Sequence, residues 1–143
     1  MILPKFLRFS LPFRWTGFQS DPVTDRVIRL KNLCKIAIEK YPSKDVTGDD
    51  IPETFCNIAL CYILTGLGYD GLCGMMANDI CLFLAESKEW SECSPEIAQE
   101  KSNYGLIVVA ACPGEKHGHV AVCHPGTLQQ SAKWNCSVPM VAN

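Results

Sequence analysis

Apolar residues recur at helical spacing in three stretches before Glu86, and this pattern predicts three helices. The first is expected from Asp21 to Tyr41, since Tyr41-Pro42 interrupts the pattern. The second follows Pro52, and the third covers about Met75 to Ala85. The apolar face of the second helix is expected to contain Cys56, Ala59, Leu60, Ile63, Leu64 and Leu67. The inner face of the third is expected to contain Met76, Ile80, Phe83 and Leu84.

Two short apolar runs in the last third of the chain have the length of β-strands, namely Leu106 to Ala111 and Val120 to Cys123. A third strand is expected over Ser137 to Ala142, at a sheet edge, because Pro139 has no N–H group for a ladder. A short helical segment over Pro95 to Lys101 precedes them. Helices followed by a small antiparallel sheet are typical of the α+β class, with the helices on one side of the sheet.

The length of 143 residues suits one domain with its own core. We expect that domain over residues 21–143, after an N-terminal arm of residues 1–20. A net charge of −2 provides no basic surface for nucleic acid. No apolar run reaches the length of a membrane span.

The N-terminal arm is apolar and basic but lacks the pattern of a signal peptide. Pro4 and Pro12 interrupt it, Arg8 and Arg14 divide its apolar residues, and no small-residue cleavage site follows. We expect a docked arm rather than a segment on a membrane surface, and synthesis in the cytoplasm. The nine cysteines lack the regular spacing of a disulfide scaffold, which favours a reducing compartment and mostly structural thiols.

Cys56 lies where the second helix should begin, with Pro52 before it and Thr54 as a good N-cap residue. Unpaired backbone N–H groups and the helix dipole favour an anion in a first turn, and a thiolate is such an anion. This environment can lower a thiol pKa from ~8.5 into the range of ~3.5–7.5. Cys61 lies deeper in the same helix and is expected to be inert.

His119 opens the second strand, between Gly118 and Val120. A cysteine nucleophile needs a base and donors for the oxyanion as well as a thiolate. His119 could act as the base, and the backbone N–H of Cys56 with the side chain of Thr54 or Asn57 could supply donors. By itself, a histidine at the mouth of a strand is more simply a solvated loop residue.

A zinc site is the rival interpretation, because five thiol and imidazole groups lie within thirteen residues: Cys112, His117, His119, Cys123 and His124. His119 and Cys123 share one strand face, whereas His124 points the other way, so one ion could not readily collect them all. No C-x-x-C pair exists. We therefore predict neither a metal nor another cofactor, and interpret His117 as a loop residue that lines the cleft. Asn78 and Asp79 are interpreted as solvated or capping residues of the third helix.

From Thr54 to Pro125 the chain resembles the papain-like amidohydrolases of the NlpC and CHAP type. The resemblance is carried by a helix-opening cysteine, a tryptophan-containing connection and two strands: Cys56 in ETFCN, Trp90, Gly105-Leu106-Ile107-Val108-Val109 and Gly118-His119-Val120-Ala121-Val122. The Gly-His-Val-Ala-Val strand is its most specific part. The Asp-Cys-Ser-Gly pattern of the NlpC branch is absent, because Phe55 precedes Cys56 and Asn57 follows it.

The resemblance implies a papain-like fold and the hydrolysis of amide bonds in peptidoglycan peptides. It makes Cys56 the nucleophile and His119 the base. A third polar residue should orient the imidazole from the next strand, where Asn135, Ser137 and Asn143 are candidates, and no carboxylate follows His119. Trp90 is expected either to line a substrate groove or to be buried against the sheet.

Such an enzyme would act on the cell wall after lysis, injection or export, and a protein inhibitor or immunity protein would be a natural partner. Two other kinds of protein stay open. The absent Asp-Cys-Ser motif and the unassigned third residue leave room for a non-catalytic binding or regulatory domain on the same scaffold. The thiol and imidazole groups leave room for a zinc-stabilised structural domain.

Overall fold

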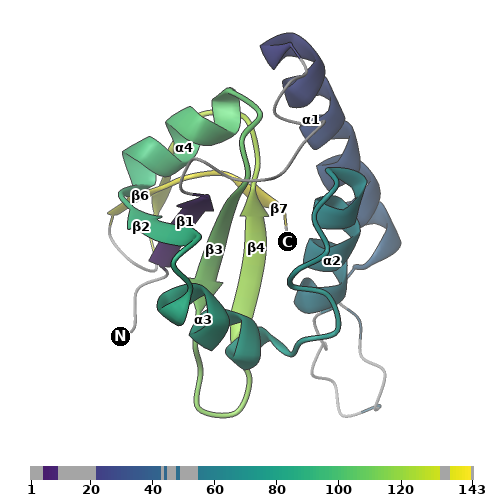
Figure 1. Ribbon diagram of the computed structural model, residues 1–143, viewed down its shortest axis with the longest axis vertical. Coiled ribbons are helices and arrows are strands. Elements are labelled where there is room, and N and C mark those ends of the chain that lie inside the picture. Colours follow the sequence, from purple (N-terminus) through teal and green to yellow (C-terminus); the bar gives the residue numbers. More distant parts are fainter. Residues whose placement is uncertain are drawn as a thin grey trace.

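A five-stranded antiparallel sheet lies at the centre of the molecule (Figure 1). The structure is a computed structural model and describes residues 5–9, 22–42, 44, 48, 55–132 and 136–142. The strand order is β2-β1-β3-β4-β7. The bounds are β1 Lys5–Phe9, β2 Trp90–Cys93, β3 Val108–Cys112, β4 His119–Cys123 and β7 Val141–Ala142. A separate pair contains β5, Gln129–Ser131, and β6, Cys136–Val138.

Four helices are present in the described residues: α1 Val23–Lys40, α2 Cys56–Gly66, α3 Ala77–Glu86 and α4 Pro95–Asn103. The three helices expected from periodicity are confirmed, with ends that differ by one or two residues. The short segment predicted from Pro95 is a helix of nine residues. Ser94 caps it, because its Oγ accepts a hydrogen bond from the N–H of Ile97 at 3.3 Å.

The molecule is a mixed α+β structure, but the helices do not all lie on one side of the sheet. Val109 and Val122 face the core formed by α1, α2 and α3. Val108 and Ala110 face Ala98 of α4 on the opposite side. The prediction of helices on one side was therefore wrong. The β3 segment explains why, because its apolar run is unbroken, and such a run is typical of a strand that is buried on both faces.

The predicted apolar face of α2 is confirmed, because its six residues are all buried. The predicted inner face of α3 is only half right. Ile80 and Leu84 are buried, whereas Met76 is 62% exposed and Phe83 38% exposed. Met76 precedes the helix as its N-cap residue, and the buried face is instead Ala77, Ile80, Cys81 and Leu84.

The segment expected to dock as an arm contributes β1 to the interior of the sheet, between β2 and β3. Residues 10–21 lie outside the described residues. The strand expected over Ser137 to Ala142 is divided at Pro139 into β6 and β7. β7 is an edge strand, as the missing N–H group of Pro139 predicted.

Cys61, which was expected to be inert, is not a free thiol. Its sulfur forms a disulfide with Cys73, and the two Cα atoms lie 5.0 Å apart. The chain turns back after α2, which brings Cys73 alongside the helix at a separation that suits this bond. The other seven cysteines are free thiols. Among the described helices, none combines the length and apolar character needed to cross a membrane.

Candidate active site

Cys56 is the first residue of α2. Phe55 occupies the N-cap position without a side-chain cap bond, so the helix begins one residue later than a Thr54 cap would place it. Thr54 itself lies outside the described residues. The Cys56 side chain is 9% exposed and belongs to the core cluster beneath α1, α2 and α3. The first N–H groups of a helix have no partner within it, so a thiolate at this position would be stabilised.

Asn57, the next residue, uses its side chain to join two helices. Its Nδ2 donates to the backbone oxygen of Met75 at 3.1 Å. Met75 lies two residues before α3, so the first turn of α2 is tied to the start of α3. One Asn57 side-chain donor is thereby engaged in a structural bond. The backbone N–H groups at the helix start are better placed as donors for an oxyanion.

His119 is the first residue of β4, and α2 packs along this strand. Both elements begin at the same end of the molecule, near the loop that joins β3 to β4 (Figure 1). His119 is half-buried and lies opposite Cys112 in the β3–β4 ladder. The nucleophile and base suggested by the sequence are therefore carried at the start of two adjoining elements.

The pleat of β4 decides the direction of each side chain. Val120 and Val122 point into the core beneath α2. A side chain on Gly118 would meet Asn78 of α3, so this position faces the helices too. His119 lies between these positions and leaves the strand on the other side. A Cys56–His119 hydrogen bond requires the imidazole to reach around the end of the sheet.

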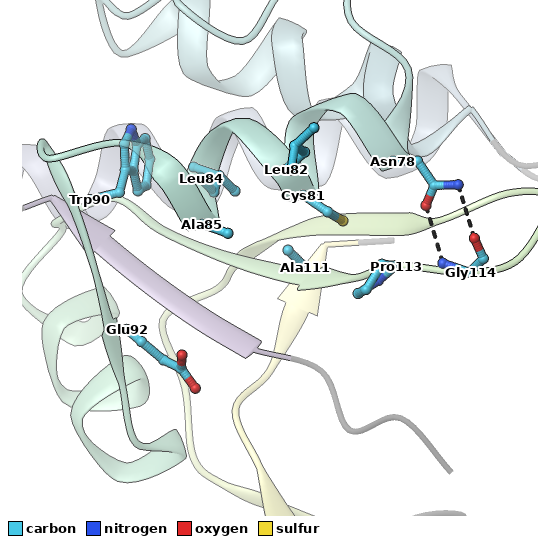
Figure 2. A pocket seen from close by; sticks show the side chains of 10 residues that line it. All are labelled: Asn78, Cys81, Leu82, Leu84, Ala85, Trp90, Glu92, Ala111, Pro113 and Gly114. Carbon is cyan, nitrogen blue, oxygen red and sulfur yellow. Dashed lines mark hydrogen bonds between the residues drawn. The ribbon is translucent and has the colours of Figure 1, made fainter.

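Asn78, interpreted from the sequence as a solvated or capping residue, holds the β3–β4 loop (Figure 2). Its Nδ2 donates to the oxygen of Gly114 at 3.0 Å. The N–H of Gly114 donates back to its Oδ1 at 3.1 Å. The loop that leads into His119 is thus bonded to the first turn of α3.

A pocket of about 420 Å³ extends from this contact along α3 (Figure 2). Its described lining residues are Asn78, Cys81, Leu82, Leu84, Ala85, Trp90, Glu92, Ala111, Pro113 and Gly114. The expected burial of Trp90 is confirmed, because it is 5% exposed, and it also lines the pocket. Its ring meets that of Tyr69 edge-on, with centroids 5.9 Å apart. A mostly apolar pocket with few polar groups is typical of small-ligand and side-chain sites.

Three free thiols differ in their environment from a reactive cysteine: Cys81 in the pocket lining, and Cys34 and Cys123 elsewhere in the core. Burial raises the pKa of Cys81, and the neighbouring thiols of Cys112 and Cys56 raise it further. Burial raises the pKa of Cys34 to about 12 and also raises that of Cys123. These thiols stay protonated at neutral pH and are structural.

His117, expected to line the cleft, lies near the start of β4 but is exposed in the β3–β4 loop and is not among the described residues that line the pocket. Ser137 lies in β6, where its Oγ donates to Oε1 of Gln130 across the β5–β6 pair at 3.5 Å. Asn135 and Asn143 lie outside the described residues. The third residue of the proposed site therefore stays a prediction.

The rival zinc set is divided between the two ends of β4. Cys112 and His119 lie at its start, while Cys123 and His124 lie at its end. A strand of five residues separates its ends by roughly 13 Å. Within the part of the chain that the structure describes, no three His, Cys, Asp or Glu side chains are grouped to hold a metal ion.

Neither the role of Asn78 nor the reason for a glycine at position 118 could be predicted from the sequence. An amide near the start of a helix and a glycine before a strand are both common, so neither is informative alone. Only their meeting in space reveals the contact.

No protein-family model matches the chain, and comparisons with curated proteins and with solved structures give no match either. Function must therefore be argued from the residues and their arrangement.

Proposed function

We propose that the chain is a papain-like cysteine amidase or endopeptidase that hydrolyses amide bonds in bacterial peptidoglycan peptides. One observation carries the proposal. Cys56 opens α2, His119 opens β4, and the helix packs along the strand with both starting at one end of the molecule (Figure 1). The peptidoglycan substrate comes from the sequence resemblance to the NlpC and CHAP enzymes.

In the proposed reaction, the His119 imidazole reaches around the end of the sheet and accepts the proton of the Cys56 thiol, and the thiolate attacks the amide carbonyl carbon. Backbone N–H groups at the start of α2 stabilise the negative oxygen of the tetrahedral intermediate. The intermediate collapses as the C–N bond breaks, and the leaving amine takes the proton from His119. Water then gives a proton to His119 and attacks the thioester, which releases the carboxylic acid and the free thiol.

The pocket beside α3 gives this chemistry a binding surface. It begins at Asn78, which is bonded to Gly114 in the loop that leads into His119. An apolar wall with a polar rim suits an extended peptide that places one side chain in the pocket. Trp90 would then form part of the floor beneath that side chain.

The test is hydrolysis of purified bacterial peptidoglycan, followed by the release of new amino groups and by mass spectrometry of the soluble peptides. Cys56→Ala should lose activity, while Cys136→Ala serves as the matched control because β6 lies outside the central sheet. Full activity of Cys56→Ala would rule out the thiolate mechanism. The masses of the products identify the bond that is cleaved.

A non-catalytic binding domain is the second candidate, and the pleat of β4 favours it. The alternation directs His119 away from the core that contains Cys56. Iodoacetamide at pH 6 separates the two functions, since a nucleophilic Cys56 should be alkylated well before the other thiols. Slow and uniform alkylation of the seven free thiols would favour the binding domain.

A further inference from the structure

We infer that Asn78 is a positioning residue, which holds the β3–β4 loop against α3 and thereby sets where His119 leaves the sheet. The catalytic consequence of this inference rests on the proposed function. The structural part, that Asn78 controls the backbone around His119, does not.

The inference begins with the two bonds between Asn78 and Gly114. One side-chain amide donates to the backbone oxygen at 3.0 Å and accepts from the backbone N–H at 3.1 Å. A pair of bonds fixes both the distance and the orientation of the loop, whereas one bond would leave it free to pivot. We call such a pair of bonds between an asparagine side chain and the backbone of a glycine an asparagine clamp. Gly114 lies five residues before His119, so this clamp acts on the loop that leads into β4.

Gly118 provides the second observation. A Cβ atom at this position would collide with Oδ1 of Asn78 and would lie 3.2 Å from both the backbone nitrogen of Asn78 and the backbone oxygen of Cys112. The loop therefore contacts Asn78 at two places, once through hydrogen bonds and once through close packing. Because Gly118 directly precedes His119, this second contact acts on the neighbouring peptide unit.

A further hydrogen bond connects α3 to the neighbour of Cys56. Asn57, next to Cys56, is bonded to Met75 at 3.1 Å, and Met75 leads into α3. Asn78 then joins α3 to the loop before His119. The start of α3 is therefore bonded both to the start of α2 and to the loop before β4. These are the two elements that would have to present a thiol and an imidazole to one substrate.

The chain contains a matched control at the other end of β4. Nδ2 of Asn103 donates to the oxygen of Gly126 at 3.0 Å, and the N–H of Gly126 donates to Oδ1 of Asn103 at 2.7 Å. Asn78→Ala and Asn103→Ala therefore each remove a pair of bonds to a loop glycine, on either side of one strand. Asn103→Ala also removes the bond that Oδ1 of Asn103 accepts from Nε2 of Gln99 at 3.1 Å. Gly118→Ala offers a second variant, since it displaces the Asn78 side chain without removing it.

The experiment measures backbone amide exchange at His119 by NMR, with the full chain, in the wild type and the three variants. We expect Asn78→Ala and Gly118→Ala to raise the exchange rate of the His119 amide by about 10-fold, and Asn103→Ala to leave it unchanged. The His119 ring resonances should shift in the first two variants only. Exchange that is unchanged in Asn78→Ala, or equally raised in Asn103→Ala, would overturn the inference.

Kinetics on peptidoglycan test the catalytic part. Asn78→Ala should lower kcat by about 10²-fold with little change in KM, because a small displacement of a base acts on the chemical step. Asn103→Ala should keep kcat within about 3-fold of the wild type, since its loop lies away from the proposed site. Equal kcat values for the two variants would contradict a positioning role. An inactive wild type would instead refute the proposed function, and amide exchange would still decide the structural part.

Discussion

Strand β4 is held at each end by an asparagine that bonds to the backbone of a glycine, yet the two ends carry different chemistry. Asn78 and Gly114 meet before the strand, and Asn103 and Gly126 meet after it. The number and kind of bonds between the asparagine and the glycine are the same at both ends. What differs is the set of side chains that each clamp surrounds.

At the far end, buried polar side chains are bonded to the backbone. Oγ of Ser102 donates to the oxygen of Cys123 at 2.9 Å. Nε2 of Gln99 donates to the oxygen of His124 at 3.0 Å, and its Oε1 accepts from the N–H of Met140 at 2.9 Å. These bonds join α4 to β4 and to the approach to β7. Each polar group satisfies a backbone group, as buried polar groups must.

At the near end, a thiol and an imidazole occupy the first positions of α2 and β4, and a pocket lies alongside. A helix start presents N–H groups that the helix itself cannot satisfy. The comparison teaches that the asparagine clamp is a structural device in this fold. Under the proposed function, the clamp at the near end has a further role, because the loop it holds leads into the base, His119.

The two histidines that flank β4 offer the sharpest test of this comparison. His119→Ala should lower kcat/KM on peptidoglycan by roughly 10⁴-fold or more, because the base is lost. His124→Ala should change it by less than about 3-fold, since Nδ1 of His124 lies 2.7 Å from the oxygen of Pro125 at the structural end. Steady-state kinetics on soluble peptidoglycan fragments would measure both. A larger loss in His124→Ala would reverse the assignment of the two ends.

Thiol reactivity should follow the same division. At pH 6, iodoacetamide should modify Cys56 roughly 10- to 100-fold faster than Cys123, because a helix start favours a thiolate while burial raises the pKa of Cys123. Peptide mapping by mass spectrometry at timed intervals gives each rate. Cys34, whose pKa burial raises to about 12, is the internal control for a protected thiol. Equal alkylation rates at Cys56 and Cys34 would contradict the prediction that Cys56 is a reactive thiol.

Stability should depend more on the far end than on the near end. Ser102 is fully buried, so Ser102→Ala leaves the oxygen of Cys123 without this donor and should cost about 1–3 kcal/mol. Asn78→Ala removes bonds at a partly exposed site and should cost about 0.5–1.5 kcal/mol. Urea unfolding of both variants tests the order. Ser102→Ala should keep its activity, and an inactive but folded Ser102→Ala would show that the far end is not purely structural.

The buried thiol of Cys34 predicts a loss of stability in alkali. The pKa of Cys34 is raised from 9.0 to about 12, so an unfolded chain ionises this thiol first. Its contribution is fully present below pH 9 and is lost as pH rises to about 12. The slope is at most about 1.4 kcal/mol per pH unit. Cys34→Ala should flatten the dependence of unfolding free energy on pH above 9, and an unchanged slope would contradict the assignment.

Much of the fold was predictable because periodicity is a local property. The stripe that includes Leu60 and Ile63 specified α2, and the apolar runs around Val109 and Val122 specified β3 and β4. The prediction of the buried face of α3 was half right, because the side of this helix that is buried depends on how the helix meets the sheet. The sequence also indicated that Cys56 opens a helix and that His119 opens a strand.

Other features depend on partners that lie far apart in the chain. β1 was missed because its backbone pairs with β2 and β3, and such pairing imposes no side-chain pattern on a short segment. The disulfide from Cys61 to Cys73 depends on the path of the turn after α2.

The sequence by itself determined the local elements and the residues that begin them, because helix and strand periods and the chemistry of helix starts act over a few residues. Only the tertiary structure decided that α4 covers the second face of the sheet and that Asn78 holds the loop before His119. These outcomes depend on the geometry between elements, where a bond forms or fails within a fraction of an ångström. The side-chain directions along β4 depend on both. The sequence determines that they alternate, whereas the tertiary structure decides which face meets α2.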